Sequence, residues 1–236
     1  MTRLTLASTR SSSSTTMLRP LPVLIPVLSM ASHFFARILE LSGRLQEKGS
    51  GLFKGNRSNT DSFFFRRARA AGLRTVGRTM TPELALSGAT ETIPNGIARN
   101  PWNLERTTGR LFWRSRRAVA AGITPIAHGN DSGGSIRGPA AFWPVVGLNP
   151  SRGRVSSGPD QDSAFGVNRE FVLCRTVRDM AAAALDVFSG PHPGDPFVIV
   201  QPDRPYCQEL SQPTGTLRVG VARTTWGNLG IDSEVL

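Results

Sequence analysis

The sequence predicts an α/β fold in which a mixed β-sheet is surrounded by helices. Helical segments alternate with short apolar segments along the 236 residues, which is typical of α/β proteins. Thr176–Phe188 is the clearest helix, because Asp179 falls in its first turn and Gly190 follows its end. Leu217–Ala222 is expected to be a strand, since it alternates in polarity and contains β-branched residues.

The remaining elements are assigned from caps, stops and apolar runs. Thr60 can N-cap a helix over Asp61–Ala71, and Gly72 can end that helix. The Pro/Gly-rich stretch Gly190–Pro205 is expected to be an excursion or linker. Five shorter segments complete the alternation: a β-rich run at Leu73–Val76, a helical stretch opening at Pro82–Glu83, a helix end at Ala118–Gly122, and buried strands at Ile123–Ala127 and Val145–Leu148.

The chain is strongly basic. Lys and Arg number 28 against 17 Asp and Glu, a formal charge of +11, which at face value favours nucleic-acid or membrane binding. Eight of the arginines lie in two windows that contain no acid, residues 1–38 and 110–117. Removing these eight charges from +11 leaves +3, so we expect no nucleic-acid partner and no membrane partner.

The first 38 residues are rich in Ser and Arg. Their apolar run Leu21–Leu28 imitates a signal or transit peptide, but two prolines interrupt the run and it is too short to span a bilayer. We therefore interpret residues 1–38 as an aberrant, disordered leader of a cytoplasmic protein, with the folded domain at 39–236. Cys174 and Cys207 match neither a disulfide framework nor a zinc-binding pattern, so no metal site is expected.

The stretch from Gly129 to Phe142 carries the best candidate for chemistry. Ser135 ends a glycine turn directly before an expected helix start, which makes it the candidate nucleophile. Gly133 and Gly134 allow backbone conformations that are closed to other residues. The successive N–H groups that begin at Ser132 could then converge on an oxyanion, usually the largest single contribution in acyl transfer. The alternative is a Gly/Ser loop that only turns the chain.

Charged side chains flank this turn. Asp131 and Arg137 could pair to hold it, although a surface pair contributes only up to about 1 kcal/mol. His128 invites the idea of a Ser–His dyad, but the sequence places no carboxylate to orient its ring. We therefore interpret His128 as a packing residue.

Further motifs surround the serine turn in order: Thr81-Pro82-Glu83-Leu84, Asn100-Pro101-Trp102-Asn103, Ala118-Val119-Ala120-Ala121-Gly122 and the segment from Val145 to Val155. With Gly133-Gly134-Ser135-Ile136-Arg137 they make the chain from Gly49 to Ser157 resemble the amidase signature family. The family hydrolyses or transfers amides through a Ser–cis-Ser–Lys triad.

The resemblance implies a large mixed sheet wrapped by helices and a small-molecule amide substrate. It places the attacking serine, and the acyl-serine intermediate, on Ser135, and it implies no metal and no cofactor. Residues 39–236 would then be a partial, C-terminally truncated amidase-signature domain, because family members continue well past the equivalent of Leu236.

Two positions depart from the family pattern. Where the family has a Gly-Ser-Ser-Gly-Gly-Ala-rich loop, this chain has Arg110–Arg117, and the position of the cis-serine falls on Leu111. The element that holds the family's catalytic lysine corresponds to Val27–Ile38, which contains no lysine, and the lysine position falls on Arg37. The resemblance therefore implies an amidase that is inactive as written.

The genetic code provides a common reason for both departures. One back-translation of Arg110–Arg117, read one base later, yields Gly-Ser-Ser-Gly-Gly-Ala-Ala-Ala. A back-translation of Pro26–Ile38, read from the last base of its first codon, yields Gly-Pro-Leu-His-Gly-Val-Pro-Leu-Leu-Arg-Lys-Asp. Trp113 and Met30 each have a single codon and still produce glycines where the family needs them. Our hypothesis is that both windows are out-of-frame translations of an ordinary amidase gene.

Three functions are open on the sequence alone. The first is a hydrolase of carbon–nitrogen bonds by descent, inactive as written. The second is the A-type component of a tRNA-dependent amidotransferase, which belongs to the same family and feeds ammonia to a partner synthetase complex. The third is a non-catalytic basic binding protein that uses Arg110–Arg117, whose interleaved arginines and aromatic rings suit base stacking.

Overall fold

A computed structural model describes most of the chain between His33 and Gly220. The described residues are 33–36, 39–79, 81–86, 91–92, 96–97, 99–100, 103–107, 118–141, 143, 145–159 and 166–220. Most of the segment 1–38 and all of the segment 110–117 lie outside them. The predictions for Arg37 and Leu111 therefore fall outside the described residues.

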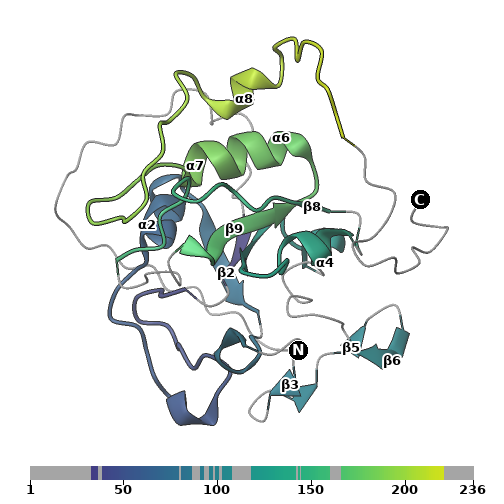
Figure 1. The fold of residues 1–236 in the computed structure, drawn as a ribbon. Helices are drawn as coiled ribbons and strands as arrows, with labels where there is room; N and C mark the ends of the chain where they lie inside the picture. The colour runs from purple at the N-terminus through teal and green to yellow at the C-terminus, as the bar shows by residue number, and fades with distance from the viewer. Residues whose placement is uncertain are drawn as a thin grey trace.

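The centre of the molecule is a five-stranded mixed sheet (Figure 1). In spatial order its strands are β2 (Arg74–Arg78), β1 (His33–Ala36), β7 (Ile126–Asp131), β9 (Arg169–Cys174) and β8 (Val146–Gly147). β1 runs parallel to β2 and β7, whereas β9 runs antiparallel to β7 and β8. This sheet, with helices packed on it, confirms the predicted α/β class.

β1 lies inside the segment that the sequence assigns to a disordered leader. Its backbone pairs with β2 on one side and with β7 on the other. A strand paired along both edges belongs to the interior of a sheet, so the folded domain includes residues before position 39. The composition of the segment could not reveal this, because the pairing partners lie far along the chain.

The helix α2 (Phe63–Ala70) begins two residues later than the predicted Asp61. The hydroxyl of Ser62 accepts the N–H of Phe65 at 3.4 Å and caps the helix, so Ser62 takes the place predicted for Thr60. Either residue type suits an N-cap, and the entry path of the chain decides between them.

Glycines end two helices as predicted. Gly72 has a φ of 78°, and the following N–H, of Leu73, donates to the carbonyl of Ala68 at 2.9 Å. This is a Schellman arrangement, in which a left-handed residue lets the chain satisfy the last carbonyls of the helix. Gly122, with a φ of 72°, ends the segment Ala118–Gly122 in the same way.

The predicted helix Thr176–Phe188 is present as one continuous helical segment. It consists of α6 (Val177–Asp179), a π-helical stretch η3 (Met180–Leu185) and α7 (Asp186–Phe188). The Thr176 hydroxyl caps it by accepting the N–H of Asp179 at 3.0 Å.

We expect Thr176→Ala to lower the free energy of unfolding by about 1 kcal/mol, because the N–H of Asp179 loses its capping oxygen. Urea denaturation measures this loss. Thr176→Ser is the matched control, since it keeps the hydroxyl, and it should stay close to the parent. An equal loss in the serine variant would show that the threonine methyl, and not the cap, carries the stabilisation.

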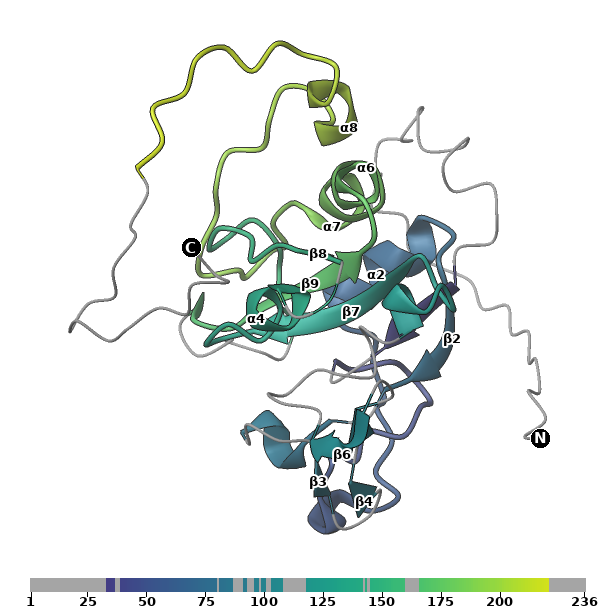
Figure 2. The ribbon, with the colours of Figure 1, turned by 90° about the vertical axis from the view of Figure 1, so that its right-hand side faces the viewer.

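Aromatic side chains join the helices to the sheet. The rings of Phe64 and Phe188 stack in parallel with centroids 3.9 Å apart, so that α2 and α7 lie side by side (Figure 2). Large apolar side chains that are almost fully buried complete this core: Leu39, Phe65, Ile126, Ile136, Phe171 and Leu173.

The strand assignments differ from the sequence in three places. β7 begins at Ile126, three residues after the predicted start, and continues to Asp131. β9 occupies the sheet beside it and has no counterpart among the predicted strands. Leu217–Gly220 forms no strand, and Leu217 and Val219 are 74% and 77% exposed, because no described strand pairs with this segment.

Smaller elements lie outside the main sheet. They are η1 (Gly51–Phe53), η2 (Glu83–Ala85), the antiparallel pair β3 (Glu91–Thr92) and β4 (Gly96–Ile97), the antiparallel pair β5 (Arg99–Asn100) and β6 (Asn103–Thr107), and α8 (Tyr206–Glu209). The β3–β6 pairs and α6 lie on opposite sides of the sheet (Figures 1 and 2). Within the described residues, no helix is both long and apolar enough to cross a membrane.

Candidate active site

The serine turn connects the end of β7 to α4 (Arg137–Ala141). Ser135 is 7% exposed and lies directly before this helix. Gly134 has a φ of 105°, a backbone conformation that side-chain-bearing residues rarely adopt. The turn is therefore built around a glycine-only conformation one residue before the candidate nucleophile.

The Asp131 carboxylate organises the turn from inside. It is fully buried and accepts the N–H of Gly134 at 2.7 Å, of Ile136 at 3.1 Å and of Arg137 at 3.3 Å. The Arg137 guanidinium adds two further bonds, from Nε at 2.9 Å and from Nη2 at 3.0 Å. The expected Asp131–Arg137 pair is thus present, but the expectation of a surface pair is wrong, because the carboxylate end has no contact with solvent.

This environment lowers the pKa of Asp131. Burial by itself would raise that pKa, but the hydrogen bonds from the Arg137 side chain and from the backbone N–H groups of Gly134, Ile136 and Arg137 outweigh burial and bring the pKa to about 2. The carboxylate is therefore ionised throughout the neutral and mildly acidic range.

The depressed pKa predicts a pH-dependent contribution to stability. A carboxylate whose pKa falls on folding stabilises the protein fully above its unfolded pKa of about 3.9 and loses that effect as the pH falls through about 2. We expect the difference in unfolding free energy between the parent and Asp131→Asn to be constant down to about pH 4 and to shrink below it. Urea titrations over this range measure it. A difference that grows with acidification would contradict an ionised Asp131.

The N–H groups of the turn face two directions. That of Gly134 donates inward to Asp131 and supports the turn. Ser132 and Gly133 are exposed, and a Cβ added at Gly133 would meet no atom within 4 Å, so a substrate can approach the backbone closely there. In this conformation, Ser132, Gly133 and Ser135 remain the candidates for holding an oxyanion.

Gly147 in β8 lets α4 pack tightly on the sheet. A Cβ at Gly147 would lie 2.6 Å from the Cβ of Ala140 and 3.0 Å from the carbonyl oxygen of Ile136. We expect Gly147→Ala to cost about 1–3 kcal/mol in unfolding free energy, measured by urea denaturation, because α4 must move away.

Gly138→Ala is the control for this overpacking. Gly138 is also in α4, but a Cβ there meets no atom within 4 Å, so the change should be neutral or slightly stabilising. Equal losses in the two variants would show that helix propensity, and not contact with β8, decides the effect.

A chain of hydrogen bonds links the turn to β9. Ser132 Oγ donates to Asn168 Oδ1 at 2.8 Å, and Asn168 Nδ2 donates to Glu170 Oε1 at 2.7 Å. The other carboxylate oxygen of Glu170 lies 2.8 Å from His128 Nε2, with both side chains fully buried. Sequence reasoning missed Asn168 and Glu170, although the apolar run Phe171–Cys174 directly before a helix is the signal that could have located β9.

His128 lies on the opposite face of β7 from the serine turn. Its ring packs 4.8 Å from that of Phe64 in α2, whereas a Cβ at its neighbour Gly129 would contact Ile136 on the α4 side. Successive residues of a strand point to opposite faces. This placement supports a packing role for His128, beside a carboxylate that the sequence did not indicate, and does not support a dyad with Ser135.

The described cysteines and acids provide no competing centre. Burial, followed by the nearby charge of Asp179, raises the pKa of the Cys174 thiol to about 12, so it stays protonated at neutral pH. In the part of the chain that the structure describes, no group of three or more His, Cys, Asp or Glu side chains is placed to hold a metal ion.

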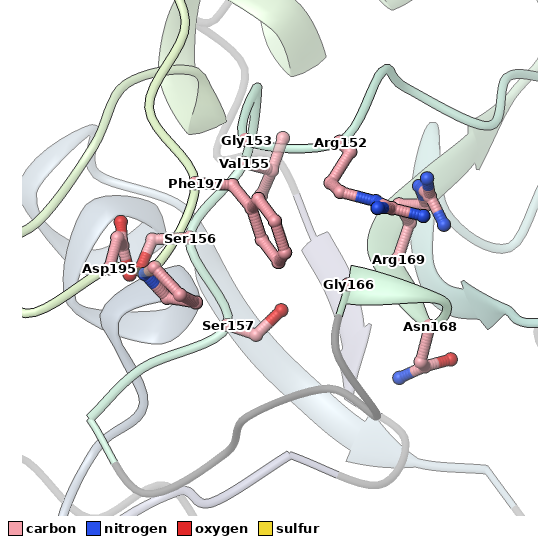
Figure 3. Close-up of a pocket in the computed structure, with 11 residues that line it drawn as sticks. Arg152, Gly153, Val155, Ser156, Ser157, Gly166, Asn168, Arg169, Asp195 and Phe197 are labelled. Carbon is pink, nitrogen blue, oxygen red and sulfur yellow. Dashed lines mark hydrogen bonds between the residues drawn. The ribbon is translucent and has the colours of Figure 1, made fainter.

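Two adjoining pockets open next to the turn. One, of about 770 Å³, is lined by Ser132 and Arg137 together with Ser151, Arg152 and Arg169. The other, of about 400 Å³, shares Arg152 and Arg169 and extends to Phe197 (Figure 3). Sequence reasoning did not identify these pockets, because their walls come from separate segments of the chain.

Comparison with known proteins decides the family. The sequence profile of the Amidase family matches residues 42–235. The chain belongs to the amidase family. This amidase chain is 46% identical over 184 residues to the 6-aminohexanoate-cyclic-dimer hydrolase of Paenarthrobacter ureafaciens, covering 76% of this chain and 37% of that protein. It is 38% identical over 165 residues to a glutamyl-tRNA(Gln) amidotransferase component, the A-type one, of Prochlorococcus marinus, covering 70% of this chain and 34% of that protein.

Solved structures give the same result for the fold. A 6-aminohexanoate cyclic dimer hydrolase complexed with substrate superposes with a TM-score of 0.74 at 42% identity, over 80% of this amidase chain and 40% of that chain. A bacterial aryl acylamidase superposes with a TM-score of 0.67 at 28% identity, over 76% and 38% of the two chains. The amidase resemblance inferred from the motifs is confirmed, and the chain spans less than half the length of these relatives.

Proposed function

We propose that this chain carries the nucleophile-bearing part of an amidase active site and that Ser135 forms an acyl-serine with a small amide substrate. The observation that carries the proposal is the buried Asp131 carboxylate, whose hydrogen bonds hold the turn around Ser135. Five bonds to one carboxylate specify a single turn geometry, which a loop that only reverses the chain does not need. The relatives, which are hydrolases of carbon–nitrogen bonds and amidotransferase components, support the same assignment.

The proposed chemistry has two steps. Ser135 Oγ bonds to the amide carbonyl carbon, its proton is taken up by a base, the carbon–nitrogen bond breaks, and the amine leaves with a proton. Water then attacks the ester and restores the serine hydroxyl. The N–H groups of Ser132 and Gly133 would stabilise the oxyanion in both steps.

The proton relay is the defective part of this proposal. Leu111 has no group that accepts a proton, and the Arg37 guanidinium stays protonated at neutral pH. We therefore propose that the chain as written does not turn over, and that out-of-frame translation of residues 27–38 and 110–117 accounts for the loss. The coding nucleotide sequence tests that explanation directly: a single uninterrupted frame that encodes Arg110–Arg117 with codons that cannot be shifted to Gly-Ser-Ser-Gly-Gly-Ala would refute it.

The nucleophile is tested with a fluorophosphonate probe. The chain as written should not react. A repaired variant, with Gly-Pro-Leu-His-Gly-Val-Pro-Leu-Leu-Arg-Lys-Asp at 27–38 and Gly-Ser-Ser-Gly-Gly-Ala-Ala-Ala at 110–117, should be labelled at Ser135. Ser135→Ala in the repaired chain should abolish labelling, and Ser115 of the parent supplies a check that a stray serine does not react. Labelling of the repaired chain at another serine would overturn the assignment.

An amidotransferase role is the second candidate, favoured by the 38% identity to the component of the glutamyl-tRNA(Gln) enzyme. The two candidates differ in their substrate. The repaired chain, extended with the C-terminal part of the Paenarthrobacter ureafaciens hydrolase or of the Prochlorococcus marinus amidotransferase component, can be given 6-aminohexanoate cyclic dimer or glutamine. Ammonia release from glutamine by the second extension alone would favour the amidotransferase.

A further inference from the structure

Three arginines surround the larger pocket beside the serine turn. Arg137 starts α4, Arg152 lies in the loop after β8, and Arg169 starts β9. The hydroxyl-bearing residues Ser132 and Ser151 line the same pocket, and no carboxylate among the described residues does. Segments far apart in the sequence therefore converge to place positive charge and hydroxyl groups at one opening.

Each guanidinium is held by a different contact. Arg137 bonds to Asp131 through Nε and Nη2, which fixes its position at the pocket edge. Arg152 lies over the ring of Phe197, with its guanidinium carbon 5.0 Å from the ring centroid. Arg169 donates from Nη1 to the carbonyl of Val167 at 2.6 Å. The charged groups are therefore oriented before any ligand arrives, which reduces the entropy cost of binding.

The charges of Arg152 and Arg169 are uncompensated among the residues that the structure describes. Neither makes an ion pair with a described carboxylate. Asp195 lines the smaller pocket opposite the two arginines (Figure 3), but its carboxylate accepts the Ser156 hydroxyl and the His192 N–H, both at 2.7 Å. Neighbouring like charges repel one another, and a bound anion would remove that repulsion.

We infer that this pocket binds a carboxylate that is part of the amide substrate, so that the substrate class is an anionic amide. A planar guanidinium matches a carboxylate in geometry and forms short charge-assisted hydrogen bonds with it. The pocket begins at Ser132, three residues before Ser135, so a carboxylate held there leaves the amide of the same small molecule over the turn. The inference rests on the proposed function, since it names the substrate of that site.

The test uses a pair of ligands that differ only in charge. Succinamate carries a primary amide and a carboxylate, and succinamide replaces that carboxylate with a second amide. The ¹⁵N-labelled chain is titrated with each, and the arginine Nε–H signals are followed by NMR. We expect saturable shifts of the Arg152 and Arg169 signals with succinamate, and at least about tenfold weaker binding of succinamide.

Matched variants locate the site. Arg152→Gln and Arg169→Gln should each weaken succinamate binding by about tenfold. Arg178→Gln removes the same charge from an exposed position of α6 that lines neither pocket, and it should leave binding unchanged. Equal weakening by all three variants would overturn the inference, because it would reflect overall charge. If a variant fails to fold by circular dichroism, the comparison of succinamate with succinamide in the parent still decides.

Two further arms separate the possible outcomes. Inorganic phosphate that binds as tightly as succinamate would identify an adventitious ion only, and the inference would fail. Ser135→Ala should bind succinamate normally. Retained succinamate binding without acylation of Ser135 in the repaired chain would refute the proposed hydrolase alone, whereas acylation without preference for succinamate would refute the anion pocket alone.

Discussion

The chain as written is expected to hydrolyse amides about a million-fold more slowly than the same chain with its two aberrant windows repaired. Removing members of a catalytic unit abolishes nearly the whole advantage of that unit, because the remaining groups cannot move the proton. Here Arg37 and Leu111 stand where the family resemblance places the lysine and the bridging serine. Their side chains offer neither a proton acceptor nor a relay at neutral pH.

The measurement compares two proteins that differ only in these windows. Both carry the same C-terminal extension from the Paenarthrobacter ureafaciens hydrolase, because this chain covers 37% of that protein. The rate of cleavage of 6-aminohexanoate cyclic dimer is measured for each, and Ser135→Ala in the repaired protein gives the background. A burst of product from the unrepaired chain that depends on Ser135 would show that another base serves, and would sink the prediction.

The second large effect is expected for Asp131→Ala, which should lower the free energy of unfolding by about 3–5 kcal/mol. The substitution leaves the N–H groups of Gly134 and Ile136 without their buried acceptor and removes the partner of the Arg137 guanidinium. An unsatisfied buried donor costs about 1–3 kcal/mol. The turn that presents Ser135 should also lose its fixed shape, seen as faster hydrogen exchange of its amides.

The control for this variant is an acid in an exposed pair. Glu209 pairs with Arg204 on the surface, with side chains 43% and 49% exposed. Glu209→Ala should change the unfolding free energy by no more than about 1 kcal/mol. If both acids cost the same on urea denaturation, burial of Asp131 would not be the source of its stabilising effect.

Local chemistry made several features of this chain predictable. Thr176 and Gly190 bound a helix because a hydroxyl cap and a left-handed glycine satisfy the groups at its two ends within a few residues. Gly72 ends α2 for the same reason. The glycine turn before Ser135 could also be read from sequence, since its conformation requires glycine at position 134.

Features that depend on distant partners could not be read in this way. The strand β9 lies beside β7 although 38 residues separate the ends of the two strands that meet at Asp131 and Arg169, and the His128–Glu170 pair exists only because of that register. Leu217–Gly220 has the pattern of a strand but remains exposed without a paired neighbour. Strand pattern alone does not create a hydrogen-bonding partner.

The sequence by itself therefore determined the α/β class, the helix ends and the turn that carries Ser135, because each depends on contacts between residues close along the chain. Only the tertiary structure decided that the Asp131 carboxylate is buried, that His128 faces α2, and that Arg152 and Arg169 share a pocket. These properties depend on which surfaces cover a side chain, and those surfaces come from segments brought together only when the sheet forms.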